Sequence, residues 1–486
     1  MRNISVGWWL VIAISCLYWL PFLLAKGMFL DGVCNALYAV NLAEGTASFW
    51  APKSNYIGNP SAWGSAPLSI YILSVLYKCF GNYFFIEKIY SLICGFIQMA
   101  LIAWAWKLCF DKNDERGKYG WFPCLLWLAS PLTGWCYSNN LMENSMSIFT
   151  TSSIVVWLLY LRNQQIQYAV AGGILIFLAL LSKGPVGLFP LAAPLVFMLM
   201  NKNIIRQRFF YFTFVQAFVF FLVFVVVFSM EAPQTFLHQY LDVQLRPALN
   251  HQNGGISFEI ILQLLLALLP IFGAVIIVVL YTAIKKDDSL LSRNDKNLIG
   301  LSFLLIGLTA SIPIMMSTKQ SKFYLLPSLS IFSLGFSLLL LPALKKSMDL
   351  FDRYPLRYKI LSATKFLSAS IIILCIVLCI NNRGIYSRDK ALLNDLAEMQ
   401  TLTGDGAILR GPWELNSEWH LFSYLSRLYK IKICMPDSEI ETNYYITYSG
   451  KSDKVPSQDF IKIYSGNKFD LYQLASADNF HKRKIN

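Results

Sequence analysis

The chain contains few charged residues for its length. Of its 486 residues only 14% are Asp, Glu, Lys or Arg, whereas about 25% is usual in a soluble domain. Hydrophobic residues make up 56% of the chain, and the mean hydropathy is +0.49. This composition excludes an ordinary soluble protein and indicates an integral membrane protein.

The sequence also lacks a cysteine framework and internal repeats. Its 10 cysteines are scattered, most of them in apolar segments, with no CxxC pair and no zinc-like spacing. Cys375 and Cys379 share a helix face in lipid-like sequence, so we interpret them as small hydrophobic residues. No repeat of about 20–50 residues and no low-complexity tract is present, which does not support a solenoid or a duplicated transporter.

Long apolar runs dominate the first 380 residues. A run of about 20 apolar residues is long enough to cross a bilayer as a helix. Roughly eleven such runs can be placed, at residues 7–25, 87–108, 121–136, 142–161, 168–182, 184–200, 209–229, 258–283, 298–316, 323–341 and 361–380. The first run is long and aromatic and has no small-residue cleavage site, so we expect it to stay in the protein.

Basic residues account for the net charge of +13 and are concentrated in alternate loops. The basic loops are "KLCFDKNDERGK", "LRNQQ", "NKNIIRQR", "KKDDSLLSRNDK" and "KKSMDLFDRYPLRYK". The positive-inside rule places these loops and the N-terminus in the cytoplasm and the region after residue 380 outside. The basic charge therefore follows from topology, and we expect no nucleic-acid partner.

Removal of the apolar runs leaves three external regions, at about residues 27–86, 230–257 and 383–486. In the first, "VCNALYAVNLAEG" and "APLSIYILSVLYKCFG" predict amphipathic helices on the outer membrane surface. The C-terminal region predicts helices at "DKALLNDLAEMQ" and "SEWHLFSYLSRLYK" and strands at "GAILRG", "YYITYS", "FIKIYS" and "FDLYQLA". We therefore expect an all-α polytopic membrane domain, residues 1–382, followed by a small α/β extracytoplasmic domain, residues 383–486.

Two carboxylates lie at the external ends of apolar runs. Asp31 follows the first run; a charge deeper in the membrane costs about 2.5–3.5 kcal/mol, so such groups usually line a wet cavity or a functional site. Alternatively, Asp31 is the N-cap of a helix that starts near Gly32. Glu143, within "SPLTGWCYSNNLMENSMSIF", lies at an external turn on the same side, and its alternative role is that of an acidic residue in a first helical turn.

Cations occupy the same side of the membrane. Lys183 lies in "LLSKGPVGLFP", where Gly184 and Pro185 predict a tight turn. Arg246 is one helical turn after Asp242, a spacing that is also typical of a solvated ion pair.

Two lysines complete this external group of cations. Lys319 and Lys322 lie in "MMSTKQSKFYLLPSLSIF". Together with Lys183 and Arg246 they would suit an anionic lipid head group, because Lys and Arg form charge-assisted hydrogen bonds with phosphate oxygens. His238 and His251 flank the Asp242–Arg246 segment, and we assign neither a role as ligand or base.

The order of these segments resembles the GT-C superfamily of polyprenyl-phosphate-dependent glycosyltransferases, especially the bacterial aminoarabinose transferase and protein O-mannosyltransferase-like families. The resemblance is carried by "LDGVCNALYAVNLAEG", "APLSIYILSVLYKCFG", "SPLTGWCYSNNLMENSMSIF", "LSKGPVG", "KFYLLP" and "FSYLSR". It implies that Asp31 is the essential acid of the first external loop and that Glu143 is the second external acidic residue. It also implies that Lys183 and Arg246 are the corresponding basic residues, in an enzyme of the bacterial inner membrane.

The chain departs from the aminoarabinose transferases at two places. Where those enzymes have a Glu-Lys pair in the first loop, this chain has Gly64 and Ser65 in "WGSAPL". The position of the family's histidine before the middle-loop arginine corresponds here to the neighbourhood of Asp242 and Val243. We therefore expect neither the family-type metal site nor another cofactor, and the sugar is left open.

The expected reaction is inverting transfer of a sugar from a polyprenyl-phosphate donor to an acceptor hydroxyl on a lipid, glycan or protein. In this scheme Asp31 is the general base, while Lys183, Arg246, Lys319 and Lys322 hold the donor phosphate. The alternatives are a polytopic transporter or lipid flippase, which usually has ionisable residues near the midplane, and a non-enzymatic scaffold.

Overall fold

The computed structural model describes residues 5–54, 65–200, 206–249, 258–285, 296–452, 455 and 459–475. The chain forms two compact units that alternate along the sequence. The transmembrane unit comprises Met1–Leu23, Trp63–Ser69 and Lys88–Asn381, and the loop–tail unit comprises Leu24–Ala62, Ile70–Glu87 and Asn382–Asn486. Most of the loop after the first apolar run therefore belongs to the same unit as the C-terminal region.

Among the described residues, 8 helices are long and apolar enough to cross a membrane. They are α4 (Ile86–Leu108), α7 (Met142–Asn163), α8 (Ile166–Lys183), α10 (Arg206–Phe228), α13 (Glu259–Lys285), α14 (Asn297–Ser311), α15 (Leu326–Leu339) and α17 (Arg357–Asn381). The 3-10 turns η5 (Ile312–Met316) and η6 (Lys322–Leu325) extend α14 and α15. The prediction of a helical, polytopic membrane protein is confirmed.

The remaining predicted spans form shorter helices because prolines interrupt them. Predicted span 121–136 is divided into α5 (Trp121–Ala129) and α6 (Pro131–Tyr137); Ser130, before Pro131, is extended with φ −70° and ψ 119°. Predicted span 184–200 is a 3-10 helix, η2 (Pro185–Ala192), followed by α9 (Ala193–Met200). In predicted span 7–25, α1 (Val6–Trp19) stops two residues before Pro21.

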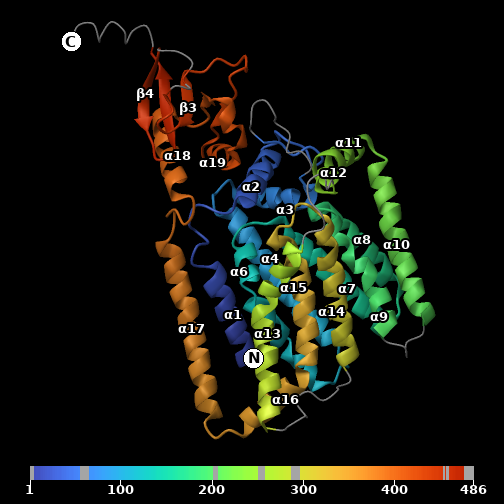
Figure 1. Ribbon diagram of the computed structural model, residues 1–486. Helices are drawn as coiled ribbons and strands as arrows, with labels where there is room; N and C mark the ends of the chain where they lie inside the picture. Colours follow the sequence, from blue (N-terminus) through green and yellow to red (C-terminus); the bar gives the residue numbers. More distant parts are fainter. Residues whose placement is uncertain are drawn as a thin grey trace. The chain divides into compact units, whose positions relative to one another are not determined.

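Small and hydroxylated residues bring the helices of the transmembrane unit together. Helix α7 packs against α8 and α15, α14 packs against α15, and α1 packs along α17 (Figure 1). A Cβ on Gly335 of α15 would lie within 2.9 Å of the carbonyl oxygen of Gly300 on α14, so this close approach requires glycine. Gln98 of α4 donates a 2.8 Å hydrogen bond to the hydroxyl of Thr151 on α7, and this hydroxyl lies 3.2 Å from that of Ser330 on α15.

The loop–tail unit contains both predicted loop helices, α2 (Leu30–Ala43) and most of α3 (Pro67–Phe80). Its C-terminal part consists of α18 (Lys390–Thr403), η7 (Trp413–Ser417), α19 (Trp419–Tyr429) and a 5-stranded sheet of order β2-β1-β3-β5-β4. The strands are β1 (Ile408–Arg410), β2 (Lys432–Cys434), β3 (Tyr444–Tyr448), β4 (Phe460–Ser465) and β5 (Phe469–Leu474). The small α/β region predicted from the sequence is therefore present, and β2 is the strand that was not predicted.

A hydrophobic core and a buried carboxylate stabilise the loop–tail unit. The hydrophobic core joins Leu393 and Leu396 of α18, Leu425 of α19 and Val33 of α2. The buried carboxylate of Asp395 accepts hydrogen bonds from the Tyr464 hydroxyl and from the backbone N–H groups of residues 467, 468 and 469 at 2.7–3.2 Å. One carboxylate therefore holds the turn between β4 and β5 against α18.

Candidate functional site

A buried ion pair joins two of the residues expected at the site. Glu143 is in the first turn of α7 and is fully buried, and its Oε1 lies 3.0 Å from Nζ of Lys183, the last residue of α8. Because α7 and α8 are consecutive antiparallel neighbours, the start of one meets the end of the other. The helix dipoles favour an anion at the first position and a cation at the second. Lys183 keeps 20% of its side chain exposed, whereas Glu143 has none of its side chain exposed.

The turn after Lys183 is held in an unusual backbone conformation. Gly184 has φ 117° and ψ −158°, and a Cβ at this position would collide with the hydroxyl of Tyr240. Pro185 is the first residue of η2, as the sequence pattern predicts. At the start of α3, the Ser69 hydroxyl donates a 2.8 Å hydrogen bond to the carbonyl of Ser182. These constraints fix the position from which Lys183 extends.

Aromatic rings surround two of the cations. Nζ of Lys183 lies 5.7 Å from the ring centroid of Phe323 and 5.3 Å from that of Tyr324, and Nζ of Lys322 lies 4.9 Å from that of Trp135. The Trp135 and Phe323 rings stack on each other at 6.2 Å. Cation–π attraction of this kind orients an ammonium without neutralising its charge. We call Trp135, Glu143, Lys183, Lys322, Phe323 and Tyr324 the Lys183 cluster.

Tyr240 lies beside this cluster and was not singled out in the sequence. It is the last residue of α11 (Glu231–Tyr240). Burial raises the pKa of Tyr240 to about 12, although the Lys183 charge opposes that rise, and Tyr324 adds to it. The phenol is therefore neutral at physiological pH, and it can donate a hydrogen bond to an anionic ligand beside Lys183.

Arg246 and Lys319 belong to a second, more exposed part of the site. Arg246 begins α12 (Arg246–Leu249). It forms an ion pair with Asp242 that is exposed to solvent, as the solvated-pair interpretation predicts. Such exposed pairs contribute about 0–1 kcal/mol, so a ligand phosphate can compete for the arginine. Nζ of Lys319 lies 3.3 Å from Oε1 of Gln244, in the π-helical turn η3 (Leu241–Leu245). Contact between these two segments brings Lys319 and Arg246 to the same region.

Asp31 lies in the first turn of α2, in the loop–tail unit. The N-cap of this helix is Phe29, so the alternative that Asp31 caps the helix is wrong. Its side chain is partly exposed, and within the described part of the chain it makes no hydrogen bond or ion pair. Burial raises the pKa of Tyr38, and the nearby Cys34 and Asp31 groups add to this effect. The predicted meeting of Asp31 with Lys183 and Arg246 joins residues of different units and stays a prediction.

A metal ion in a protein is commonly held by several His, Cys, Asp or Glu side chains. Across the ranges that the structure describes, no three His, Cys, Asp or Glu side chains are arranged so that they could hold one. Gly64, at one of the two places where the chain departs from the aminoarabinose transferases, lies outside the described residues, and so does His251, to which no role was assigned.

Comparison with known families matches residues 64–227 to the family described as dolichyl-phosphate-mannose-protein mannosyltransferase. The matched segment contains Glu143 and Lys183. Comparison with curated protein sequences gave no match.

Solved structures show the same fold over nearly the whole chain. ArnT from Cupriavidus metallidurans bound to undecaprenyl phosphate is 12% identical with a TM-score of 0.67, covering 98% of this chain and 99% of ArnT. The apo state of that ArnT gives a TM-score of 0.63 at 12% identity, covering 96% of this chain and 97% of ArnT. The Archaeoglobus fulgidus oligosaccharyltransferase in the apo form gives a TM-score of 0.53 at 13% identity, covering 92% of this chain and 70% of that protein. The fold is therefore that of ArnT, and the fold that the resemblance implied is confirmed.

Proposed function

We propose that this protein is an integral-membrane glycosyltransferase. It moves a hexosyl or pentosyl group from a polyprenyl-phosphate donor to an acceptor hydroxyl of a lipid, glycan or protein. The ArnT fold and the mannosyltransferase family match support this class of reaction. The undecaprenyl phosphate bound to ArnT supports a polyprenyl-phosphate donor.

The observation that carries the proposal is the Lys183 cluster. The ammonium of Lys183, on a partly exposed side chain, lies 3.0 Å from a buried carboxylate and 5.7 Å from the Phe323 ring centroid, and Lys322 lies 4.9 Å from the ring centroid of Trp135, which stacks on Phe323. Preorganised cations of this kind stabilise negative charge that grows in the transition state, which is usually the largest electrostatic contribution to catalysis. The growing charge here is that of the departing lipid phosphate.

Bond making and breaking follow an inverting displacement. Asp31 accepts the proton of the acceptor hydroxyl, the acceptor oxygen bonds to the anomeric carbon, and the bond from that carbon to the phosphate oxygen breaks. The electron pair leaves with polyprenyl phosphate, whose anion Lys183, Arg246, Lys319 and Lys322 hold. General-base assistance of this type typically contributes about 10²–10⁴-fold.

Glu143 has a different role from Asp31 in this scheme. Its carboxylate is fully buried and engaged with Lys183, which favours a residue that positions the lysine over one that contacts the acceptor. The enzyme would act at the outer face of the bacterial inner membrane, with its N-terminus in the cytoplasm and its C-terminal α/β region outside.

Release of free polyprenyl phosphate tests the proposal. The full chain in lipid nanodiscs would receive polyprenyl phosphate carrying labelled mannose, glucose or aminoarabinose, together with a cell-envelope extract as the acceptor source. We expect at least one donor to yield free polyprenyl phosphate and a labelled acceptor, and Lys183→Gln to reduce both. A protein that moves lipid-linked sugar across vesicles without releasing polyprenyl phosphate would be a transporter, and the proposal would be wrong.

A further inference from the structure

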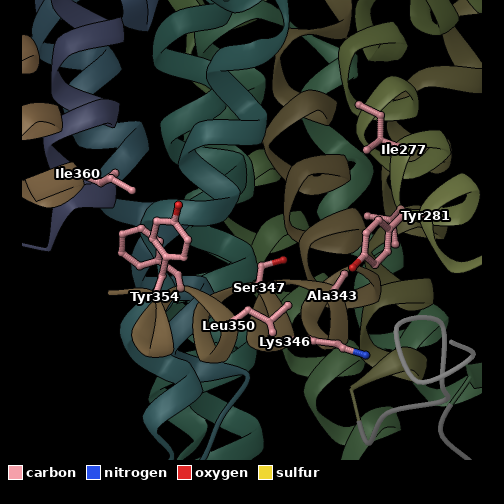
Figure 2. Close-up of a pocket in the computed structure, with 10 residues that line it drawn as sticks. Ile277, Tyr281, Ala343, Lys346, Ser347, Leu350, Tyr354 and Ile360 are labelled. Atoms are coloured by element: carbon pink, nitrogen blue, oxygen red, sulfur yellow. The ribbon is translucent and has the colours of Figure 1, made fainter. Parts of the chain in front are cut away.

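A groove of about 660 Å³ lies in the transmembrane unit between α13, α16 (Leu341–Arg353) and the start of α17 (Figure 2). Its walls are largely apolar. Ile277 of α13 is 69% exposed, Leu350 of α16 is 53% exposed and Ile360 of α17 is 40% exposed. The volume is in the range of about 300–1,000 Å³ that is usual for ligand pockets, and the apolar walls suit a hydrocarbon chain.

Polar groups gather along one face of α16. Lys346 and Ser347 precede Leu350 by four and three residues, so all three side chains lie on the face that lines the groove. Figure 2 shows Ser347 between Tyr354 on one side and Tyr281 on the other. An ammonium and three hydroxyl groups therefore border an apolar groove. This combination suits the phosphate of a lipid head group whose acyl chain lies in the groove.

The charge around the groove is complementary to such a head group. Segment 345–359, "KKSMDLFDRYPLRYK", contains five basic residues and two acidic residues. One acidic residue is already paired, since Arg357 lies 3.8 Å from the carboxylate of Asp352 and donates a 2.6 Å hydrogen bond to its carbonyl. The excess of positive charge next to apolar helices is typical of segments that bind anionic lipids.

The groove is distinct from the Lys183 cluster. The backbone N–H of Ile260, at the start of α13, donates a 3.0 Å hydrogen bond to Gln320, beside Lys319. Ile277 follows Ile260 by 17 residues in the same helix, which at 1.5 Å per residue is about 25 Å farther along. A ligand in the groove therefore lies near the other end of α13.

We propose that this groove binds one anionic glycerophospholipid. An acyl chain lies against Ile277, Leu350 and Ile360, and the phosphate contacts Lys346 and Ser347. The bound lipid joins α16 to α13 and α17. This inference does not depend on the proposed glycosyl transfer, because no residue of the Lys183 cluster takes part.

Lipid-dependent thermal unfolding of the purified full chain in detergent tests the proposal, with native mass spectrometry to count retained lipids. Phosphatidylglycerol is compared with phosphatidylcholine of the same acyl chains. We expect phosphatidylglycerol to raise Tm to a plateau and to remain bound as one molecule, at concentrations that leave phosphatidylcholine without effect. Lys346→Gln should weaken this binding about fivefold, as expected for one lysine beside a phosphate.

Two further variants separate groove binding from general charge. Ser347 is exposed, so Ser347→Trp fills the groove without disturbing the core and should abolish the effect. Lys345 is exposed and does not line the groove, so Lys345→Gln should bind phosphatidylglycerol as the wild type does. Equal stabilisation by both lipids, or equal losses for Lys345→Gln and Lys346→Gln, would overturn the proposal. The proposal would also be overturned if soluble glycerol phosphate raised Tm to the same plateau, or if the protein bound undecaprenyl phosphate in preference to phosphatidylglycerol.

Discussion

The ammonium of Lys183 lies 3.0 Å from the carboxylate of Glu143, with the acid fully buried and the lysine partly exposed. A buried carboxylate without a partner is strongly destabilising, so the pair is needed for stability wherever the acid is retained. Part of the lysine side chain remains exposed, and the proposed function assigns its ammonium to the donor phosphate. Stability and the proposed function therefore depend on the same contact.

A double-mutant cycle measures this dependence. Lys183→Met leaves the Glu143 carboxylate buried without its cation, so we expect it to lower the free energy of unfolding by about 3–5 kcal/mol. Adding Glu143→Gln removes the buried charge and should restore part of the loss, while transfer stays absent. Thermal unfolding and polyprenyl-phosphate release would be measured on all four proteins. Additive effects within about 0.5 kcal/mol would show that the two residues are not coupled.

Asp31 has a matched control on its own helix. Asp31→Asn should lower transfer by about 10²–10⁴-fold with little change in Tm, because the proposed base makes no ion pair within the described residues. Glu44, the C-cap of α2, forms an exposed ion pair with Lys430 at 3.0 Å. Glu44→Gln removes the same charge and should leave the rate of transfer within about twofold of wild type. Equal rates for the two variants would remove Asp31 from the mechanism.

The Gly184 turn gives a test based on backbone conformation. Gly184→Ala puts a Cβ at φ 117° against the Tyr240 hydroxyl, so it should displace Lys183 and reduce transfer at least tenfold. Gly273, in the interior of α13, has open space around an added Cβ. Gly273→Ala should therefore fold normally and retain activity. Donor titration would show a raised KM for Gly184→Ala, and wild-type kinetics would contradict the assigned role of the turn.

Hydropathy and periodicity were enough to predict the helical membrane domain, both loop helices and most of the C-terminal α/β region. Prolines account for what the span prediction missed. A sliding apolar window does not register Pro131, which separates α5 from α6. Strand β2 has only three residues, and its pairing with β1 depends on tertiary structure that the local pattern does not contain.

The sequence predicted those residues of the candidate site that are ionisable and lie at the ends of apolar runs. Glu143 and Lys183 stood out as ionisable residues at the ends of apolar runs, and the structure joins them. Trp135 and Tyr240 did not stand out, because aromatic residues are common throughout the chain and their role comes from packing beside Lys183 and Lys322. Asp31 was considered as the N-cap of a helix starting near Gly32, but α2 begins at Leu30 with Phe29 as its N-cap, so Asp31 lies two residues after the cap, in the first turn.

The buried guanidinium of Arg427 provides a stability prediction for the loop–tail unit. It lies 3.0 Å from Glu87, donates to the Tyr77 hydroxyl at 3.2 Å and donates to the Tyr83 carbonyl at 2.9 Å. Arg427→Met leaves the buried Glu87 carboxylate without its cation and with a hydrogen bond from the Tyr77 hydroxyl, so we expect a loss of about 3–5 kcal/mol. Lys430→Met, at the exposed end of α19, should cost less than about 1 kcal/mol. Urea unfolding of the full chain measures both, and similar midpoints would contradict the prediction.

His420 of α19 predicts how stability depends on pH. Its pKa is lowered below 6.5, mainly because burial disfavours the charged ring; Asp389 opposes this effect, and the positive charges of Arg388 and Lys468 reinforce it. The folded state therefore binds a proton less readily than the unfolded state. The stability contribution of neutral His420 is complete above about pH 6.5 and is lost as the pH falls toward the lowered pKa.

Thermal unfolding of the full chain between pH 7.5 and pH 5 measures this effect. Tm of the wild-type protein should fall as the pH is lowered through this window, and it should fall less in His420→Gln, whose side chain does not titrate. At pH 7.5 the histidine is neutral in both the folded and the unfolded state, so a difference between the two proteins there reports packing alone. The diagnostic quantity is therefore the slope of Tm against pH. Parallel slopes for the two proteins would assign the acid sensitivity to other groups, because removal of His420 would then leave the difference in proton binding between the folded and unfolded states unchanged.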